Sequence, residues 1–314
     1  METIGVALIG AGSIADYHLG GMAHVAGAAM RLVVGRDLER ARAVAARHGV
    51  AGATDDLAAA LARDDVAAAI VATPDHTHEA IAGAAIDAGR AVLLQKPMAP
   101  DSAACRRLMA RAGAAGVDLQ VSWMHRYFEE IDAARALIDA GRVGAVRSVR
   151  LRNATPGPDW GDWFFRRDCV GGGVVLQLGA HGLDLVGCMF GRIVSVQAHV
   201  ATLRPERRLA DGRSVAVENA DTALAIYRLA DGLLVHHEMS MIEAAGVDRF
   251  RMEIYGDEGT IWLRSERGRL ASIRRGEPGW TTHDLSQAPL GARHHQDWID
   301  GLRGRAPRRD TARD

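Results

Sequence analysis

The chain opens with a short apolar run that leads directly into a glycine-rich turn: Thr3-Ile4-Gly5-Val6-Ala7-Leu8-Ile9-Gly10-Ala11-Gly12-Ser13-Ile14-Ala15. A helical pattern follows, so the stretch predicts a strand, a turn and a helix in that order. Such glycines let the backbone approach a pyrophosphate at the helix N-terminus, where unpaired N–H groups point at the anion. The stretch therefore predicts a dinucleotide site with contacts at Gly10, Gly12, Ser13 and Ile14. The alternative is a tight structural turn.

Further apolar runs follow in the first 122 residues, and they are continuous rather than alternating. They lie at 32–34, 66–72, 91–94 and 117–121, separated by stretches with a helical period. Continuous apolar strands are buried on both faces, as in a parallel sheet covered by helices. Residues 1–122 are therefore predicted to form a doubly wound α/β domain of the Rossmann type, with helix starts at Asp37, Asp55, Asp75 and Asp101.

The pattern changes after about residue 145. Apolar and polar residues alternate at 193–203, 220–229, 233–241 and 249–255, and a helical segment lies at roughly 173–188. Turn signals such as Asp231-Gly232 between the alternating segments are typical of hairpins. Residues 123–314 are therefore predicted to form an α+β domain with a mostly antiparallel, open sheet.

Composition narrows the class of protein. The 314 residues carry 38 basic and 39 acidic side chains, a net charge of −1, which leaves no basic excess for nucleic acid. Apolar runs stay well short of the roughly 18 residues of a membrane span, and no targeting segment is recognisable. Three cysteines without C-x-x-C spacing favour a reducing compartment. We expect a cytoplasmic protein whose ligand is a small molecule, bound without nucleic acid or membrane.

The end of the second predicted strand bears on the choice of dinucleotide. NAD-binding domains usually place an acidic residue there for the adenine ribose, whereas this chain reads Gly35-Arg36-Asp37. Glycine removes the carboxylate that would repel a 2′-phosphate, and Arg36 can pair with that phosphate through two hydrogen bonds. This favours NADP over NAD. Two other interpretations stay open, since Asp37 could reach the ribose itself or cap the next helix.

One lysine is present among the 38 basic residues, and it is Lys96. It follows the predicted strand at 91–94 in Gln95-Lys96-Pro97, at the carboxyl end of a parallel strand, where open α/β sheets bind ligands. An ammonium group donates in any direction and can give up a proton, which a guanidinium cannot do at useful pH. Lys96 is therefore a candidate catalytic residue, with a solvated surface lysine as the alternative.

These motifs together resemble the Gfo/Idh/MocA oxidoreductases, the family of glucose-fructose oxidoreductase and inositol dehydrogenase. The resemblance covers nearly the whole chain and adds two matching patterns, Thr73-Pro74-Asp75-His76-x-His78 and Gly171-Gly172-Gly173-x-x-x-Gln177-x-x-x-His181-x-x-Asp184. It implies catalytic roles for Lys96 and His181, with assistance from residue 177. It also implies that Thr73, Pro74, His78, Gln95 and Lys96 contact the cofactor.

Two positions depart from the family pattern. Gln95 and Gln177 stand where relatives usually have Glu and Asp, so two anions become neutral amides. On a helix, Gln177, His181 and Asp184 would share one face. Without a carboxylate beside it, His181 loses an interaction that favours its charged form, which leaves more of the neutral base near pH 7.

The motifs favour hydride transfer between a carbinol carbon of a sugar or polyol and nicotinamide, with His181 as acid or base and Lys96 bound to the reacting oxygen. The two glutamines motivate a second hypothesis, an enzyme that uses its bound nucleotide for redox-neutral epimerisation, elimination or glycoside cleavage. A third is a nucleotide-binding or sugar-binding sensor without turnover, which the presence of Lys96 and His181 disfavours.

Candidate substrate contacts come from the second region. The loop 153–168 places four aromatic residues close together in an aromatic-poor chain. Aromatic faces pack against the apolar faces of sugars, and the alternative is a hydrophobic plug between the domains. The candidates are Trp160, Trp163 and Arg166 from this loop, His125 and Arg126 from the predicted domain junction, and Asp184 from the helix. No histidine pair has the spacing of a closed metal site, so no metal is expected.

The resemblance also implies an oligomer, because relatives commonly bury the open sheet face between subunits. Residues 307–314 resemble the lead-in to a further helix that packs near the cofactor domain in relatives, and nothing follows Asp314. Either this protein has lost that helix or the chain is incomplete, and loss would leave apolar surface that a subunit contact could cover. We therefore expect a homodimer or homotetramer.

Overall fold

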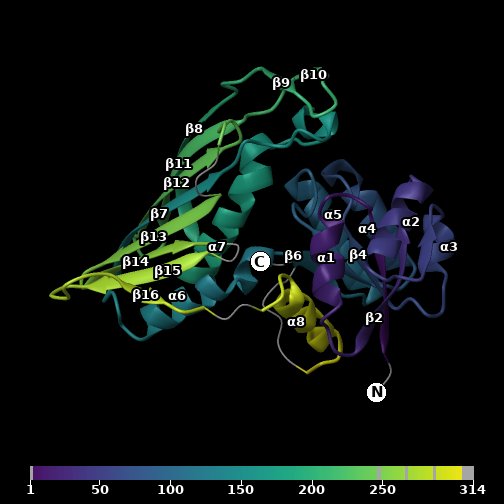
Figure 1. Ribbon diagram of the computed structural model, residues 1–314, viewed down its shortest axis with the longest axis horizontal. Helices are drawn as coiled ribbons and strands as arrows, with labels where there is room; N and C mark the ends of the chain where they lie inside the picture. Colours follow the sequence, from purple (N-terminus) through teal and green to yellow (C-terminus); the bar gives the residue numbers. More distant parts are fainter. Residues whose placement is uncertain (1–2, 246–248, 266–267, 286–287, 306–314) are drawn as a thin grey trace. The chain divides into compact units, whose positions relative to one another are not determined.

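The computed structural model describes residues 3–245, 249–265, 268–285 and 288–305, and it forms two compact units (Figure 1). One unit contains residues up to Met124 together with the segment that begins at Ala288; residues 125–287 form the other. The expected second domain, 123–314, is thus wrong in its last part. The reason is that α8 (Ala292–Leu302) packs against α1 (Ala15–Met22) of the first unit.

The first unit is built on a parallel sheet of six strands in the order β3-β2-β1-β4-β5-β6. The strands are β1 (Ile4–Ile9), β2 (Ala28–Val34), β3 (Gly52–Thr54), β4 (Ala68–Val71), β5 (Ala91–Gln95) and β6 (Leu119–Ser122). The helices besides α1 and α8 are α2 (Leu38–Arg47), α3 (Leu57–Leu61), η1 (Asp75–Thr77), α4 (His78–Asp87) and α5 (Ser102–Ala115). The chain reverses its strand order between β1 and β4, which is where doubly wound sheets bind their ligands. The predicted Rossmann fold is confirmed.

Burial explains why these strands read as continuous apolar runs. Every residue of β4 is buried, and the strands contribute side chains to two hydrophobic clusters. Of the predicted helix starts, Asp37 and Asp101 cap α2 and α5 by accepting from Arg40 N–H and Ala104 N–H. The prediction for Asp55 was wrong by one residue, because Asp56 caps α3. Asp75 lies inside the short helix η1 rather than before it.

The contact between α1 and α8 is made of paired aromatic side chains. The Tyr17 hydroxyl lies 3.0 Å from His294 Nδ1, and His18 Nδ1 lies 2.9 Å from His295 Nε2. All four side chains are buried. The feature expected at residues 307–314 lies outside the described residues.

The second unit is built on a mixed sheet of eight strands in the order β16-β15-β14-β13-β7-β12-β11-β8. The strands are β7 (Val146–Ala154), β8 (Ile193–Ala201), β11 (Thr222–Leu229), β12 (Leu234–Ser240), β13 (Phe250–Gly256), β14 (Gly259–Arg264), β15 (Arg269–Arg274) and β16 (Thr281–His283). Strands β9 (Glu206–Arg208) and β10 (Ser214–Ala216) form a separate hairpin. All neighbours in the large sheet are antiparallel except β12 and β7, so the predicted mostly antiparallel sheet is confirmed.

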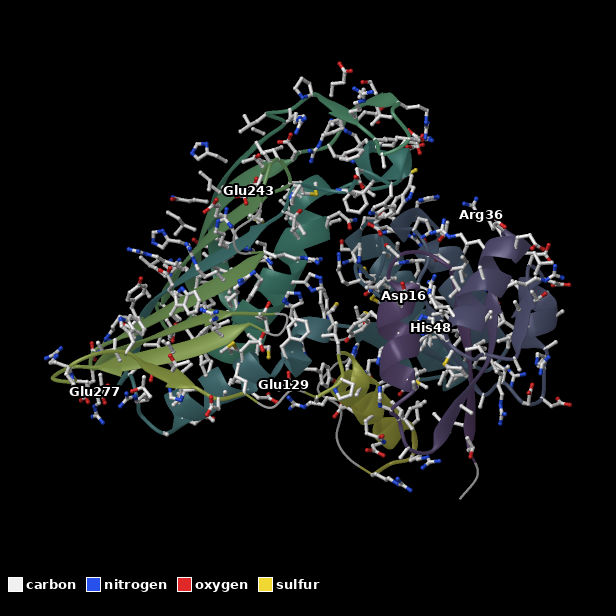
Figure 2. All side chains as sticks on the ribbon, viewed as in Figure 1. Asp16, Arg36, His48, Glu129, Glu243 and Glu277 are labelled. Atoms are coloured by element: carbon white, nitrogen blue, oxygen red, sulfur yellow. The ribbon has the colours of Figure 1, made fainter. Side chains whose placement is uncertain are left out.

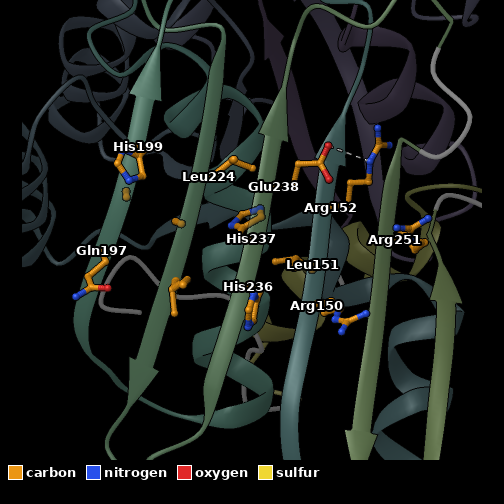
Figure 3. A pocket seen from close by; sticks show the side chains of 13 residues that line it. Arg150, Leu151, Arg152, Gln197, His199, Leu224, His236, His237, Glu238 and Arg251 are labelled. Atoms are coloured by element: carbon orange, nitrogen blue, oxygen red, sulfur yellow. Dashed lines mark ion pairs between the residues drawn. The ribbon is translucent and has the colours of Figure 1, made fainter.

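One face of this large sheet is covered by helices and the other is open. The helices of the unit are η2 (Met124–Tyr127), α6 (Glu129–Asp139), η3 (Asp162–Phe165), the π-helical turn η4 (Val175–Gly179) and α7 (Ala180–Phe190). Gly182 lets α7 lie directly on the sheet, because a Cβ there would come within 2.5 Å of Leu151 and of the His237 ring. On the open face, side chains of β7, β8, β11 and β12 surround a shallow depression of about 410 Å³ (Figure 3).

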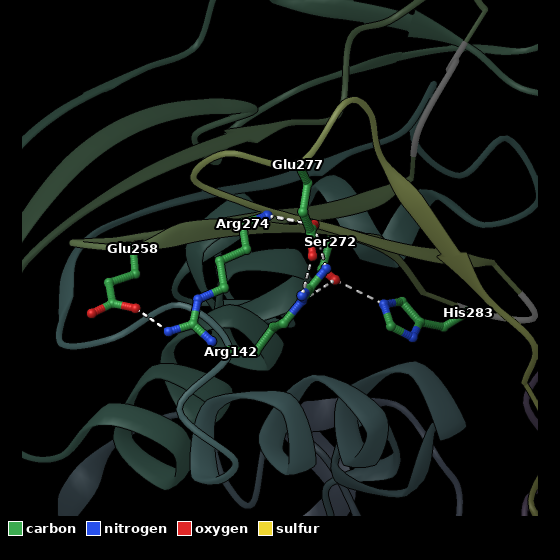
Figure 4. Close-up of polar contacts among 6 residues, drawn as sticks. All are labelled: Arg142, Glu258, Ser272, Arg274, Glu277 and His283. Atoms are coloured by element: carbon green, nitrogen blue, oxygen red, sulfur yellow. Dashed lines mark hydrogen bonds and ion pairs between the residues drawn. The ribbon is translucent and has the colours of Figure 1, made fainter.

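A polar network ties the segment after α6 to the β15–β16 edge (Figure 4). Arg142 donates two hydrogen bonds of 2.6 Å to the Glu277 carboxylate and one of 3.1 Å to Ser272 Oγ. His283 Nε2 lies 2.9 Å from the same Ser272 hydroxyl, and Arg274 pairs with Glu258. The hydrogen bonds from the Arg142 guanidinium are the largest of the effects that lower the pKa of Glu277.

Within the described ranges, no helix is long and apolar enough to cross a membrane. Across those same ranges, we find no cluster of three or more His, Cys, Asp or Glu side chains arranged to hold a metal ion.

Candidate active site

The glycine-rich turn follows β1 as predicted, and glycine occupies its two positions for different reasons. Gly10 has a φ of +116°, and a Cβ there would come within 2.3 Å of the Ala72 carbonyl oxygen, so the fold itself requires glycine. A Cβ on Gly12 would meet no protein atom within 4 Å. The protein's packing therefore does not explain Gly12. Open space at this position is what close approach of a pyrophosphate would require, and a cofactor contact at Gly12 stays a prediction.

The geometry at the end of β2 favours a capping role for Asp37 over a contact with the adenine ribose. Asp37 Oδ1 accepts from Arg40 N–H at 3.0 Å, so this carboxylate caps α2. Arg36 is exposed (Figure 2), and it forms no hydrogen bond or ion pair with any other residue that the structure describes. A guanidinium in this position is available to an anion from solution.

Lys96 follows β5 at the carboxyl edge of the sheet, and its backbone is held by its neighbour. The Gln95 side chain is buried, and its Oε1 accepts from the Lys96 N–H at 2.8 Å. The amide oxygen thus makes a hydrogen bond that a glutamate at this position could also make. The departure at residue 95 therefore removes a charge without removing this contact.

The turn at residues 73–78 lies at the end of β4, next along the same edge. The Thr77 hydroxyl donates toward Pro74 O at 2.7 Å and lies 2.8 Å from Thr73 Oγ1, which closes the turn. His78 begins α4 and is fully buried, with Nδ1 2.7 Å from Pro97 O and Nε2 2.8 Å from Thr73 O. Its ring therefore binds the chain's own carbonyls. A direct cofactor contact for Thr73, Pro74 or His78 stays a prediction.

His181 belongs to the second unit and lies in the first turn of α7, directly after the π-helical turn η4. Gln177 lies within that turn, so the expected α-helical spacing between residues 177, 181 and 184 is interrupted. A π turn bonds i to i+5, and such turns are frequent at functional sites. Gln177 and His181 are both buried.

His125 stacks on His181, with ring centroids 4.1 Å apart and planes at 21°. Phe128 and Phe250 pack around His125 at centroid distances of 4.8 and 5.0 Å. The stack holds the plane of the His181 ring. The sequence indicated His125 as a substrate contact; its packing against the candidate acid/base residue is a role that this reasoning missed, since nothing local in the sequence signals a ring stack across 56 positions.

Arg126 and Asp184, both predicted to contact substrate, bind each other. Arg126 Nε lies 3.0 Å from both carboxylate oxygens of Asp184, and the two side chains are 8% and 5% exposed. Each charge is neutralised by the other in a buried pair. Such a pair orients its neighbours and would meet a substrate as a unit rather than as two separate charges.

The aromatic loop forms a cluster at the surface of the second unit. Trp160 is 54% exposed, and the rings of Trp160, Trp163 and Phe164 lie within 6.0 Å of one another by their centroids. Phe165 is buried with Leu209 and Val217, which anchors the loop to the region of the β9–β10 hairpin. Arg166 pairs with Asp168. Phe165 thus packs within its own unit, and a plug between domains is not shown by these contacts. A sugar contact at Trp160, Trp163 or Arg166 stays a prediction.

The fold and these motifs define a two-domain protein with a dinucleotide-binding Rossmann unit. Residues 4–123 match the family described as "Oxidoreductase family, NAD-binding Rossmann fold", and residues 131–262 match the "GFO/IDH/MocA C-terminal domain". The chain belongs to the Gfo/Idh/MocA family, and it is an oxidoreductase.

Two curated relatives and one solved structure illustrate the similarity. Inositol 2-dehydrogenase 1 of Saccharopolyspora erythraea is 33% identical over 83% of this chain and 74% of its own length. Levoglucosan dehydrogenase of Pseudarthrobacter phenanthrenivorans is 25% identical over 85% and 75%. The structure of GenD2 from gentamicin A biosynthesis, in complex with NAD, is 29% identical over 100% of this chain and 90% of that one, with a TM-score of 0.81.

Proposed function

We propose that the protein is an NADP(H)-dependent dehydrogenase that transfers hydride between a carbinol carbon of a sugar or polyol and nicotinamide. One observation carries the proposal: the single lysine of the chain follows β5 on the same sheet edge where the dinucleotide turn follows β1. The names of two relatives, an inositol and a levoglucosan dehydrogenase, support the substrate class.

The residues would divide the chemistry as follows. A bound nicotinamide supplies the acceptor or donor of hydride. His181 takes the proton of the substrate hydroxyl during oxidation and returns it during reduction. Lys96 donates a hydrogen bond to the same oxygen as it becomes a carbonyl. His125 holds the His181 ring by stacking, and Gln177 supplies a neutral amide in place of a carboxylate.

The preference for NADP rests on the end of β2. Arg36 is exposed, Gly35 carries no side chain, and the carboxylate that follows in the sequence, Asp37, is bound to the N-terminus of α2. A 2′-phosphate next to this segment would find a guanidinium and would meet no competing carboxylate from residue 35.

The test is a panel of sugars and polyols incubated with the enzyme and either NADP or NAD, read by the absorbance of the reduced nucleotide. We expect reduction of NADP with at least one polyol. The neutral glutamines at 95 and 177 favour a second candidate, redox-neutral chemistry with retained nucleotide. Conversion of a sugar without net change in nucleotide absorbance would identify that candidate, and ligand binding without any conversion would identify a sensor.

A further inference from the structure

His78 has an arrangement that the proposed mechanism does not use. Its side chain has no exposed surface, and each ring nitrogen faces a backbone carbonyl oxygen, Pro97 O at 2.7 Å and Thr73 O at 2.8 Å. A carbonyl oxygen only accepts hydrogen bonds. A neutral imidazole has one N–H and one bare nitrogen, so a neutral ring would set a lone pair against an oxygen at one of these two positions.

The charged groups that act on His78 come from two elements. Burial has the largest effect and lowers the pKa of His78, whereas the Asp75 carboxylate in η1 and the two carbonyls raise it, and Lys96 after β5 lowers it further. On balance these effects lower the pKa of His78, so the case for a doubly protonated ring rests on the geometry of its two carbonyl contacts. Two hydrogen bonds from one ring require two N–H groups, and an unmatched lone pair in a buried site costs more than in water.

We propose that His78 is a positioning residue that carries a proton on both ring nitrogens and ties the loop of Lys96 to the loop of Thr73 and Pro74. The backbone around Lys96 is then held on both sides. Gln95 Oε1 accepts from the Lys96 N–H at 2.8 Å, and His78 donates to the carbonyl of the next residue, Pro97. The catalytic consequence rests on the proposed function of Lys96, while the protonation of the ring does not.

The protonation is tested on the wild-type protein by ¹⁵N NMR of labelled histidine, with His78 assigned through its backbone resonances. At pH 7.5, a histidine with the ordinary pKa of roughly 6.5 is mostly neutral. We expect both His78 nitrogens to give the signals of protonated nitrogens at this pH. A signal from one bare nitrogen would overturn the proposal, whatever the activity of the enzyme.

The positioning is tested by His78→Gln, whose two N–H donors lie on one nitrogen and so cannot replace donors at both the Nδ1 and the Nε2 position of the ring. We expect turnover to fall by ~10²-fold, the size of loss that a small misplacement of a catalytic group causes. His76→Gln is the matched control, since His76 is exposed in the same turn and should leave turnover within about twofold. Wild-type turnover in His78→Gln would show that the ring does not position Lys96. An inactive wild-type enzyme on every sugar would instead count against the proposed function, and the NMR result would still stand.

Discussion

Gly35 and Arg36 carry the proposed choice of dinucleotide. In the double variant Gly35→Asp, Arg36→Ala, a carboxylate repels the 2′-phosphate and a bidentate pair is lost, so preference should move toward NAD by ~1–3 kcal/mol. The fold should accept the new side chain after a small shift, because the nearest neighbours of its Cβ would be the Cβ atoms of Ala41 and Ala11 at 3.3 and 3.4 Å and the Asp37 carbonyl oxygen at 3.6 Å. The measurement is kcat/KM with each dinucleotide.

Arg40→Ala serves as the control for this double variant, because Arg40 is an exposed arginine of the same helix start. It should leave the ratio of the two kcat/KM values unchanged. An unchanged ratio in the double variant would show that Arg36 does not select the cofactor.

His181 should matter for turnover and not for nucleotide affinity, because it lies in the second unit and the dinucleotide turn lies in the first. His181→Ala should lower kcat by ~10²–10⁴, as expected of a lost acid/base group. His236→Ala is the control, since His236 is an exposed histidine on the open sheet face. Fluorescence titration with reduced nucleotide gives the affinity, and an equal loss of binding would indicate a structural histidine instead.

At the scale of elements, two adjacent aspartates at the start of α3 allow the contribution of a helix cap to be measured. Asp56 accepts from Ala59 N–H at 2.9 Å, whereas Asp55 lies one residue outside the helix cap. Asp56→Ala should lower the free energy of unfolding by ~0.5–2 kcal/mol, the usual worth of a cap. Urea denaturation measures this loss. Asp55→Ala should change it by less than about 0.5 kcal/mol, and equal losses in both variants would contradict the assignment of the cap.

Asp55 and Asp56 also show what the sequence alone could not predict. The order strand, turn, helix was predictable from residues 3–15, because glycine spacing and apolar runs are local signals. Which of two adjacent aspartates caps a helix depends on backbone angles that the residue types alone do not determine. The π turn at Val175–Gly179 was unpredictable for the same reason, because a helical pattern in the sequence does not distinguish i+4 from i+5 bonding.

The remaining differences come from contacts between residues far apart in the chain. The Arg126–Asp184 pair joins positions 58 residues apart, and the contact of α8 with α1 spans 277. Periodicity within either segment does not identify its partner. For the same reason, the sequence predicts candidate catalytic residues but not the contacts that orient them, such as the His125 stack on His181.

At the scale of the whole molecule, buried neutral histidines should make the protein sensitive to mild acid. Burial lowers the pKa of His237, His294 and His295 to about 3 and places that of His18 well below its ordinary value. The unfolded chain binds protons on these rings near pH 6.5, while the folded chain does not. Unfolding is therefore favoured as the pH falls below about 6.5, by up to ~1.4 kcal/mol per pH unit for each histidine.

The three histidines with a pKa of about 3 would together give a slope of up to about 4 kcal/mol per pH unit between pH 6 and 5. Urea midpoints at pH 7, 6 and 5 measure it, and these three rings should contribute little to the change above pH 7. His237→Gln should reduce the slope in the acid range. Equal midpoints at pH 7 and pH 5 would mean that these rings gain protons in the folded state.

The open face of the large sheet leads to the expected oligomer. Leu224 and Ile226 of β11 are 55% and 41% exposed and line the depression on this face (Figure 3). Leu234 of β12 is 43% exposed. Apolar side chains gathered on one sheet face of a soluble protein are commonly covered by a second subunit, and a twofold axis lets each copy cover the other.

Light scattering at micromolar concentration should therefore give a mass above the 33.6 kDa of one chain. Leu224→Glu with Ile226→Glu should return it to that value, because two carboxylates would have to be buried at the contact. Leu290→Glu, at a leucine of similar exposure in the first unit, should leave the mass unchanged. A wild-type particle of 33.6 kDa would refute the oligomer, and an oligomer that survives the double variant would place the contact on another surface.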